Sequence, residues 1–149
     1  MALNLKSAAF TDGEAVPKKH TADGDDLSPP LTWDAGPSPT KEFALICDDP
    51  DAPTPEPWVH WVAYGIPGTR TSLPEGTAGG APEGKNSWNR RGYGGPMPPP
   101  GHGTHHYHFK VYALDTPLNL RPGATKRQLL DAMKGHILDQ GELVGTYER

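Results

Sequence analysis

Two side chains able to bind a ligand or to transfer protons, His105 and Tyr107, stand directly after a loop of unusual composition. The loop, residues 94–103, is rich in proline, which removes backbone donors, and in glycine, which permits positive φ. From Tyr107 onward apolar and polar residues alternate, which is the period of a half-buried strand, and the same parity places His105 on the core-facing side. A stiff loop thus delivers an imidazole and a phenol to one rim of the core, which predicts a small-ligand pocket.

A second group of ionisable side chains follows the apolar run 43–47. In Asp48-Asp49-Pro50-Asp51 the proline holds the preceding residue extended, so the acidic turn is stiff. Asp49 stands at the end of a predicted strand and is the best candidate to point into a pocket. Asp48 and Asp51 are equally well explained as caps that accept hydrogen bonds from amides of the turn.

A histidine also lies inside the aromatic-rich segment 58–64, which is predicted to be a strand. Alternation places His60 on one face with Trp58, Val62 and Tyr64. A histidine among apolar residues is most often hydrogen-bonded within the core. The acidic turn just upstream favours a second interpretation, in which a carboxylate orients one ring nitrogen of His60 and the other nitrogen faces a ligand.

If Asp49, His60, Gly95, His105 and Tyr107 converge, they form a site for a compact anion such as phosphate. Imidazole N–H groups, the phenol O–H and an unobstructed amide at the Gly95 turn all donate hydrogen bonds. Asp49 fits such a site if it pairs with a histidine and raises the pKa of that ring, or if it meets the cationic part of a zwitterionic ligand. We expect binding to strengthen as the histidines protonate.

Two other kinds of chemistry stay open. Four imidazoles within seven residues suggest a metal site, although no cysteine accompanies them at a familiar spacing: they are His102, His105, His106 and His108. The other alternative is a small hydrolase in which His60 or His105 is the general base and Asp49 orients it. That hydrolase lacks a nucleophile, because no Gly-x-Ser-x-Gly sequence occurs and Cys47 is predicted to be buried and inert.

Length and composition limit the classes of protein to which this chain can belong. Its 149 residues predict one domain, residues 1–149, with a sizeable core. A net charge of −4 and the absence of Lys/Arg runs among aromatics argue against a nucleic-acid partner. One cysteine excludes an internal disulfide, and the sequence contains neither a leader pattern in residues 1–10 nor a bilayer-spanning apolar run. We therefore expect a cytoplasmic protein without a transmembrane segment.

The elements that must position these groups are short strands joined by stiff loops. Strand patterns occur at residues 3–10, 28–33, 43–47, 58–64, 105–113 and 142–149. A further short strand is expected near 87–89, within the long loop 65–103. A late helix follows a capping box at Thr125, with apolar residues at helical spacing as far as Ile137. Gly135 interrupts this pattern, so it predicts one broken helix or two short ones.

Seven motifs in order resemble the phosphatidylethanolamine-binding protein family, and in particular its bacterial and archaeal branch of Raf-kinase-inhibitor-like proteins. They are SPPLTW (28–33), DDPDAP (48–53), WVHW (58–61), GKNS (84–87), GYGGP (92–96), HHY (105–107) and GTYER (145–149). The resemblance implies a mainly β fold, with two antiparallel sheets in a Greek-key β-sandwich and a short helical segment near the C-terminus. It also implies a pocket at one end for anions such as phosphate, phosphorylated headgroups or acetate, and no cofactor.

The resemblance assigns the family's pocket residues by position to Asp49, Asp51, His60, Gly95, His105 and Tyr107. It also implies a cis peptide at Ala52-Pro53. The chain departs from the family at His106, where arginine is usual, and at Met97, where cysteine is common.

The expected function is therefore that of a non-catalytic regulatory protein, kinase- or protease-inhibitor-like, that binds phosphate or a phosphorylated headgroup. The expected protein partner is a kinase or a protease. Exposed aromatics in the long loop are compatible with a homodimer, but no feature demands one. A small hydrolase or a metal-dependent enzyme is the alternative.

Overall fold

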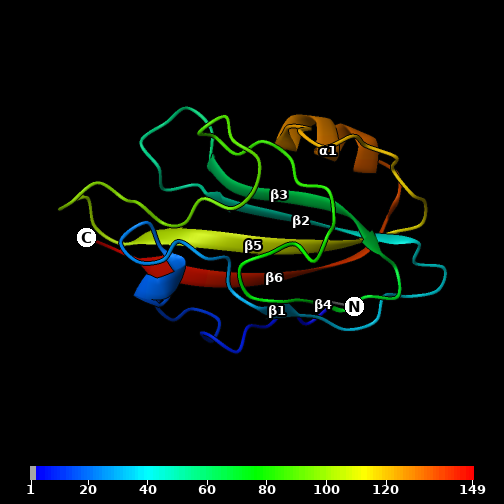
Figure 1. The fold of residues 1–149 in the computed structure, drawn as a ribbon, viewed down its shortest axis with the longest axis horizontal. Coiled ribbons are helices and arrows are strands. Elements are labelled where there is room, and N and C mark those ends of the chain that lie inside the picture. The colour runs from blue at the N-terminus through cyan, green and yellow to red at the C-terminus, as the bar shows by residue number, and fades with distance from the viewer. Residues whose placement is uncertain (1–2) are drawn as a thin grey trace.

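Residues 3–149 are described by the computed structural model, which contains two antiparallel sheets (Figure 1). The larger sheet has the strand order β3-β2-β5-β6, and the smaller sheet pairs β1 with β4. The elements are η1 (Lys18–His20), β1 (Leu31–Thr32), β2 (Glu42–Asp49), β3 (Trp58–Pro67), β4 (Ser72–Leu73), β5 (His105–Leu114), α1 (Lys126–Met133) and β6 (Ile137–Tyr147). The expected mainly β fold, with two antiparallel sheets and a short helix near the C-terminus, is confirmed.

β2 lies inside the larger sheet because its apolar sequence suits burial on both faces. All eight of its residues are buried. Antiparallel pairing places Cys47 of β2 opposite Trp61 of β3 on one side and opposite Phe109 of β5 on the other. Burial raises the pKa of the Cys47 thiol well above its usual value, and the neighbouring carboxylates add to the effect. This position agrees with the prediction that Cys47 is inert.

The main core lies between the two sheets. Alternate residues of β2 and β5 face the smaller sheet, which contributes Leu31 and Leu73. Trp33 follows β1, and its ring meets that of Phe43 edge-on with centroids 5.5 Å apart. The tryptophan therefore anchors this core.

The opposite face of the larger sheet is covered by α1 (Figure 1). The Thr125 hydroxyl accepts a hydrogen bond from the Gln128 amide, and the Gln128 side chain accepts one from the Thr125 amide, which is the predicted capping box. Leu129 and Met133 are buried in a second apolar cluster with residues of β2 and β3. One sheet therefore supports two apolar layers.

The structure corrects the expected length of the helix. α1 ends at Met133, and Ile137 is the first residue of β6. Gly135 lies between them with φ 83°, a conformation in which a side chain would be strained. Only the first part of the helical pattern is therefore helical.

Three other local expectations were wrong. Residues 3–10 form no strand, because their pairing is limited to an isolated bridge between Lys6 and Thr32. The apolar side chains of this segment still pack in the core. The segment 87–89 is a turn in which Asn89 has φ 60°, a value that asparagine tolerates better than most residues. The cis peptide precedes Pro39, after Ser38, and not Pro53.

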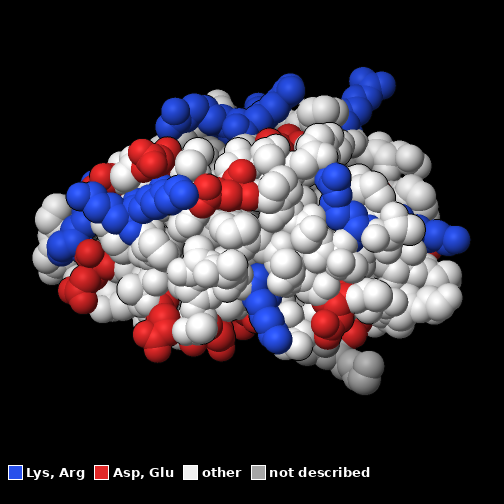
Figure 2. All heavy atoms as spheres, turned by 60° about the horizontal axis from the view of Figure 1, so that its bottom comes forward, with Lys and Arg blue, Asp and Glu red and all other residues white. Residues whose placement is uncertain are grey.

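Charged side chains of both signs are interspersed on the face shown in Figure 2, and most of that face is uncharged. This view shows no continuous basic surface of the kind that binds a nucleic-acid backbone. Within residues 3–149, no helix has both the length and the apolar character needed to cross a membrane.

Candidate functional site

The ends of three strands lie together at one end of the larger sheet, where they surround a pocket of about 320 Å³. β2 ends at Asp49, opposite Trp58 at the start of β3, and β5 begins nearby at His105. Antiparallel pairing brings these ends together although they are far apart in sequence. The pocket is lined by Asp49, Ala52, Pro53, Thr54, Trp58, His60, Trp88, Met97, Pro98, Pro99, His105 and Tyr107.

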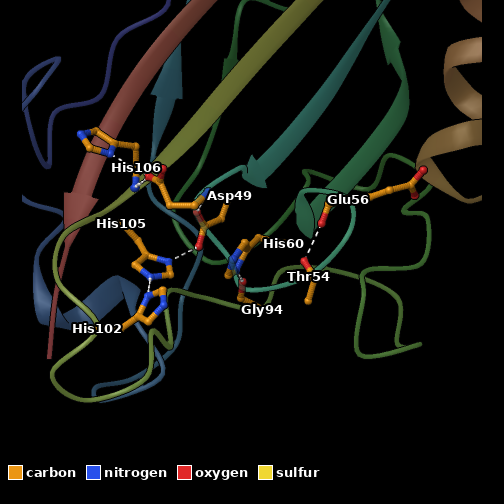
Figure 3. Close-up of polar contacts among 9 residues, drawn as sticks. Asp49, Thr54, Glu56, His60, Gly94, His102, His105 and His106 are labelled. Atoms are coloured by element: carbon orange, nitrogen blue, oxygen red, sulfur yellow. Dashed lines mark hydrogen bonds and ion pairs between the residues drawn. The ribbon is translucent and has the colours of Figure 1, made fainter.

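A buried Asp49–His105 pair forms part of the pocket (Figure 3). The Nδ1 atom of His105 is 2.6 Å from Oδ2 of Asp49, and their side chains are 2% and 4% exposed. A carboxylate accepts only, so His105 donates its Nδ1–H. The other oxygen of Asp49 accepts from the Asp51 amide at 2.8 Å. Both oxygens of Asp49 therefore accept hydrogen bonds from the protein. The carboxylate orients the ring of His105 and presents no free oxygen to an anion in the pocket.

The second ring nitrogen of His105 also has a neighbour. Its Nε2 atom is 2.6 Å from Nδ1 of His102, whose side chain comes from the loop before β5 (Figure 3). Because the Nδ1–H of His105 is used by Asp49, its Nε2 accepts from His102 when both rings are neutral. His102 thus covers the nitrogen of His105 that a ligand would contact.

His60 reaches the pocket because β3 contains a bulge. The pairing shifts between Cys47 opposite Trp61 and Asp48 opposite Val59, which leaves His60 as the extra residue. The ring of His60 therefore meets those of Tyr107 and Trp88, at centroid distances of 5.1 and 5.2 Å. This corrects the prediction from alternation that His60 shares a face with Val62 and Tyr64, which belong to the cluster under α1.

The tautomer of His60 follows from its partner. Nδ1 of His60 is 2.6 Å from the carbonyl oxygen of Gly94, which can only accept, so Nδ1 carries the proton and donates. Nε2 is then a lone pair in the neutral ring and a donor in the charged ring. Burial lowers the pKa of His60 below 6.5, although the Gly94 hydrogen bond and nearby carboxylates oppose this shift.

Tyr107 supplies the remaining polar group. Its hydroxyl is buried and has no hydrogen-bond partner among the described residues. Burial raises the pKa of Tyr107 far above its usual value, and the charge of Asp49 acts in the same direction, so the hydroxyl keeps its proton. The pocket therefore holds a phenol that can donate a hydrogen bond.

Two of the predicted site residues stand outside the pocket lining. The Gly95 amide donates to Oδ1 of Asp26 at 2.7 Å. It is therefore not available to a ligand, contrary to the expectation from the sequence. A side chain at Gly95 would come within 2.6 Å of Asp26 and of the His20 carbonyl, so packing alone explains this glycine. Asp51 is exposed and accepts hydrogen bonds from the ring and the amide of His106, each at 2.8 Å.

The four clustered histidines do not converge on one point. His102 and His105 contact each other at the pocket, whereas His106 pairs with Asp51 and His108 with Glu142 on the other face of β5. Within residues 3–149, no group of three or more His, Cys, Asp and Glu side chains is arranged to hold a metal ion. The geometry therefore divides the histidines between two sites.

Sequence reasoning missed the apolar rim of the pocket. Trp58 and Trp88 meet edge-on with ring centroids 5.5 Å apart, and Met97, Pro98 and Pro99 complete the wall. Met97 is 47% exposed, which is unusual for so large an apolar side chain. The signal available for Trp88 was its position in the long loop 65–103, and the bulge in β3 left no signal in the sequence.

Known proteins match this chain over nearly its whole length. A family profile described as phosphatidylethanolamine-binding protein matches residues 6–148. A UPF0098 protein of Methanothermobacter thermautotrophicus is 48% identical over 153 residues, which covers 99% of each chain.

Two solved structures share the fold. A phosphatidylethanolamine-binding protein homologue from Chlamydia trachomatis has a TM-score of 0.92 and 41% identity, covering 97% of this chain and 96% of that one. Escherichia coli YbcL, described as a new member of the mammalian PEBP family, has a TM-score of 0.90 and 33% identity, covering 97% of both chains.

Proposed function

The chain belongs to the phosphatidylethanolamine-binding protein family, and from that premise we propose that its pocket binds phosphate or a phosphorylated headgroup without changing it chemically. Three side chains contact the anion: His60 and Tyr107 directly, and His105 once His102 has moved aside. Asp49 orients His105 through the hydrogen bond to its Nδ1.

The unpartnered hydroxyl of Tyr107 is the observation that carries this proposal. A buried polar group without a partner costs free energy, so most such groups in proteins are hydrogen-bonded. Here a phenol that stays protonated lines a pocket beside His60, whose Nδ1 donates to the Gly94 carbonyl. An anion provides acceptors for both groups, and hydrogen bonds to charged groups are the stronger kind.

The rim suits the organic part of a phosphorylated headgroup. The faces and edges of Trp58 and Trp88 offer apolar contact, and an indole face attracts an ammonium group. A phosphomonoester with a short alkyl or alkylammonium substituent would therefore place its phosphate at the histidines and its substituent against the tryptophans.

The lining favours binding over catalysis. Among the described lining residues, Thr54 has the single aliphatic hydroxyl, and it donates to the Glu56 carbonyl (Figure 3). Cys47 is buried in the core with a raised pKa, so it is a poor nucleophile. A regulatory role with a kinase or protease as partner, a homodimeric state and a cytoplasmic location all stay predictions.

Calorimetric titration tests the proposal. Phosphate and phosphoethanolamine are titrated into metal-stripped protein at about pH 6 and about pH 8, and the sample is followed by ³¹P NMR to detect turnover. We expect saturable binding that is tighter at the lower pH and is lost in His105→Gln. His136→Gln is the matched control, because His136 also pairs with a carboxylate, Asp115 at 2.8 Å, but away from the pocket.

Two results would overturn the proposal. Absence of saturable binding at both pH values would remove the anion site. Release of inorganic phosphate from phosphoethanolamine, lost in His105→Gln, would make the protein a hydrolase.

A further inference from the structure

A second polar cavity lies beside the N-terminal end of α1. Two segments meet there, 84–91 and 121–130, and neither contains an aspartate or a glutamate. Their basic residues are Lys85, Arg90, Arg91, Arg121, Lys126 and Arg127, out of 14 Lys and Arg in a chain of net charge −4. Positive charge is therefore concentrated on one part of an acidic protein.

Backbone hydrogen bonds hold the two segments side by side. The Lys85 amide donates to the Ala124 carbonyl at 2.9 Å, and the Gly123 amide donates to the Glu83 carbonyl at 3.0 Å. A groove of about 410 Å³ runs between them and residues 56–59, and we call it the basic groove. None of its lining residues lines the histidine pocket, because Val59 and Trp58 point to opposite sides of β3.

Three of these basic residues line the groove, Lys85, Lys126 and Arg127, and they differ in how far a carboxylate neutralises them. Lys126 pairs with the buried carboxylate of Asp48 at 2.6 Å, and Arg127 lies 3.8 Å from Asp131 in an exposed pair that contributes little. No carboxylate of the described residues comes within ion-pair distance of Lys85. Glu56 is the one acidic residue described in the lining, and its side chain extends away from the histidines toward α1 (Figure 3).

The remaining lining is apolar or can form hydrogen bonds. Pro57, Val59 and Leu130 form apolar wall, and Leu130 is 38% exposed. The Ser87 hydroxyl accepts from the Val59 amide at 2.7 Å, which leaves its own O–H free to donate. Cations, donors and apolar side chains thus line the same groove.

We propose that the basic groove binds an acidic peptide segment of a partner protein. Carboxylates of the segment pair with Lys85 and Arg127, and an apolar side chain packs on Leu130. A compact polyphosphate would leave the apolar wall without contacts. A nucleic acid fits less well, because the protein is acidic overall and no aromatic ring described in this groove is available for base stacking.

Fluorescence anisotropy of a labelled peptide, Glu-Glu-Leu-Glu-Glu-Leu, tests the proposal at about 20 mM and about 200 mM salt. We expect saturable binding that weakens several-fold at the higher salt and at least roughly tenfold in Lys85→Ala/Arg127→Ala. Lys126 is left intact because it neutralises a buried carboxylate. Glu56→Gln should tighten binding, since it removes a like charge from the lining.

The matched control is Lys41→Ala/Lys134→Ala, which removes the same net charge from exposed positions outside the groove. Amide shifts in the NMR spectrum should map to Ser87, Asn89 and Arg127. Three results overturn the proposal: no saturable binding at low salt, equal loss in the control, or equal affinity of the Gln-substituted peptide. Tighter groove binding of tripolyphosphate or of single-stranded DNA would reject a peptide as the ligand class.

Discussion

At the scale of single residues, the pocket is best understood by asking which polar atoms already have partners. Asp49 uses both oxygens, on His105 and on the amide of Asp51. One ring nitrogen of His60 donates a hydrogen bond to a backbone carbonyl. The hydroxyl of Tyr107 has no hydrogen-bond partner among the described residues. We therefore expect a ligand to contact Nε2 of His60 and the phenol, while the carboxylate has a supporting role.

Tyr107→Phe should affect binding and stability in opposite directions. Binding of phosphate should weaken roughly tenfold or more, because a hydrogen bond to a charged group contributes about 1.5–3 kcal/mol. The free energy of unfolding should stay unchanged or rise by up to about 1 kcal/mol, because the variant removes a buried hydroxyl that has no partner. Calorimetry and urea denaturation measure the two quantities. Unchanged binding would exclude the phenol from the site.

His60 should make the stability of the free protein depend on pH. Its pKa is lowered in the fold from 6.5, mainly by burial, so between the lowered value and 6.5 the unfolded chain binds more protons than the folded one. Stability should therefore rise with pH through this window and be lost as pH falls. Urea midpoints between about pH 5 and pH 7.5 measure it, and His60→Gln should flatten the slope in that range.

Bound phosphate should change stability with pH in the opposite direction to His60 in the free protein. An anion near Nε2 favours the charged ring, so binding takes up a proton and the stabilisation by phosphate should grow as pH falls. Calorimetry in buffers with different ionisation enthalpies measures the uptake. A phosphate-induced shift of the melting temperature that is independent of pH would contradict this role of His60.

At the scale of elements, regular strands were predictable and irregular ones were not. Alternation along β5 placed His105 and Tyr107 correctly, because the pairing of β5 with β6 is unbroken from His105 to Ala113. The same reasoning failed at His60, because a bulge in β3 shifts the side chain to the other face. A bulge depends on how two strands pair, so one strand's sequence does not reveal it.

In the loops, too, local features were predictable from the sequence and contacts between distant segments were not. The capping box at Thr125 is a local hydrogen-bond pattern, and the sequence was sufficient to predict it. The contact of Asp26 with Gly95 brings together two loops that are far apart in the sequence and whose paths depend on the whole fold. The cavity therefore lies at strand ends that the sequence indicated, whereas the partner of the Gly95 amide could not be read from the sequence.

The loop that carries His102 should limit access to the site. His102 is exposed, and Gly101 and Gly103 beside it have positive φ. His102→Ala should expose Nε2 of His105 and tighten phosphate binding about fivefold, the worth of one net hydrogen bond of about 1 kcal/mol. Stability should change little, because the side chain is at the surface.

His106→Ala is the matched control for His102→Ala, since His106 adjoins His105 but contacts Asp51 on the outer face of β5. Phosphate affinity should not change in this control. Weaker binding in His102→Ala would show instead that His102 holds the ligand.

At the scale of the whole molecule, one sheet joins two apolar layers. Phe43, Leu45 and Cys47 of β2 belong to the core between the sheets, while Ala44 and Ile46 face the layer under α1. The apolar run 43–47 predicted a strand here, but what covers each face of that strand is set by segments far along the chain. Because both layers share β2, we expect them to unfold together.

Leu129→Ala tests this coupling. Leu129 is fully buried under α1, so the change should lower the free energy of unfolding by about 2–5 kcal/mol. The four tryptophans report on other regions, since Trp33 and Trp61 lie in the main core and Trp58 and Trp88 line the pocket. If the layers are coupled, the urea midpoints from tryptophan fluorescence and from far-ultraviolet circular dichroism should fall equally.

Leu130→Ala, the same change at the exposed neighbouring position, should move neither midpoint appreciably. A fluorescence midpoint that stays in place while the dichroism midpoint falls would show that α1 unfolds separately, and the pocket would then keep its ligand affinity without the helix.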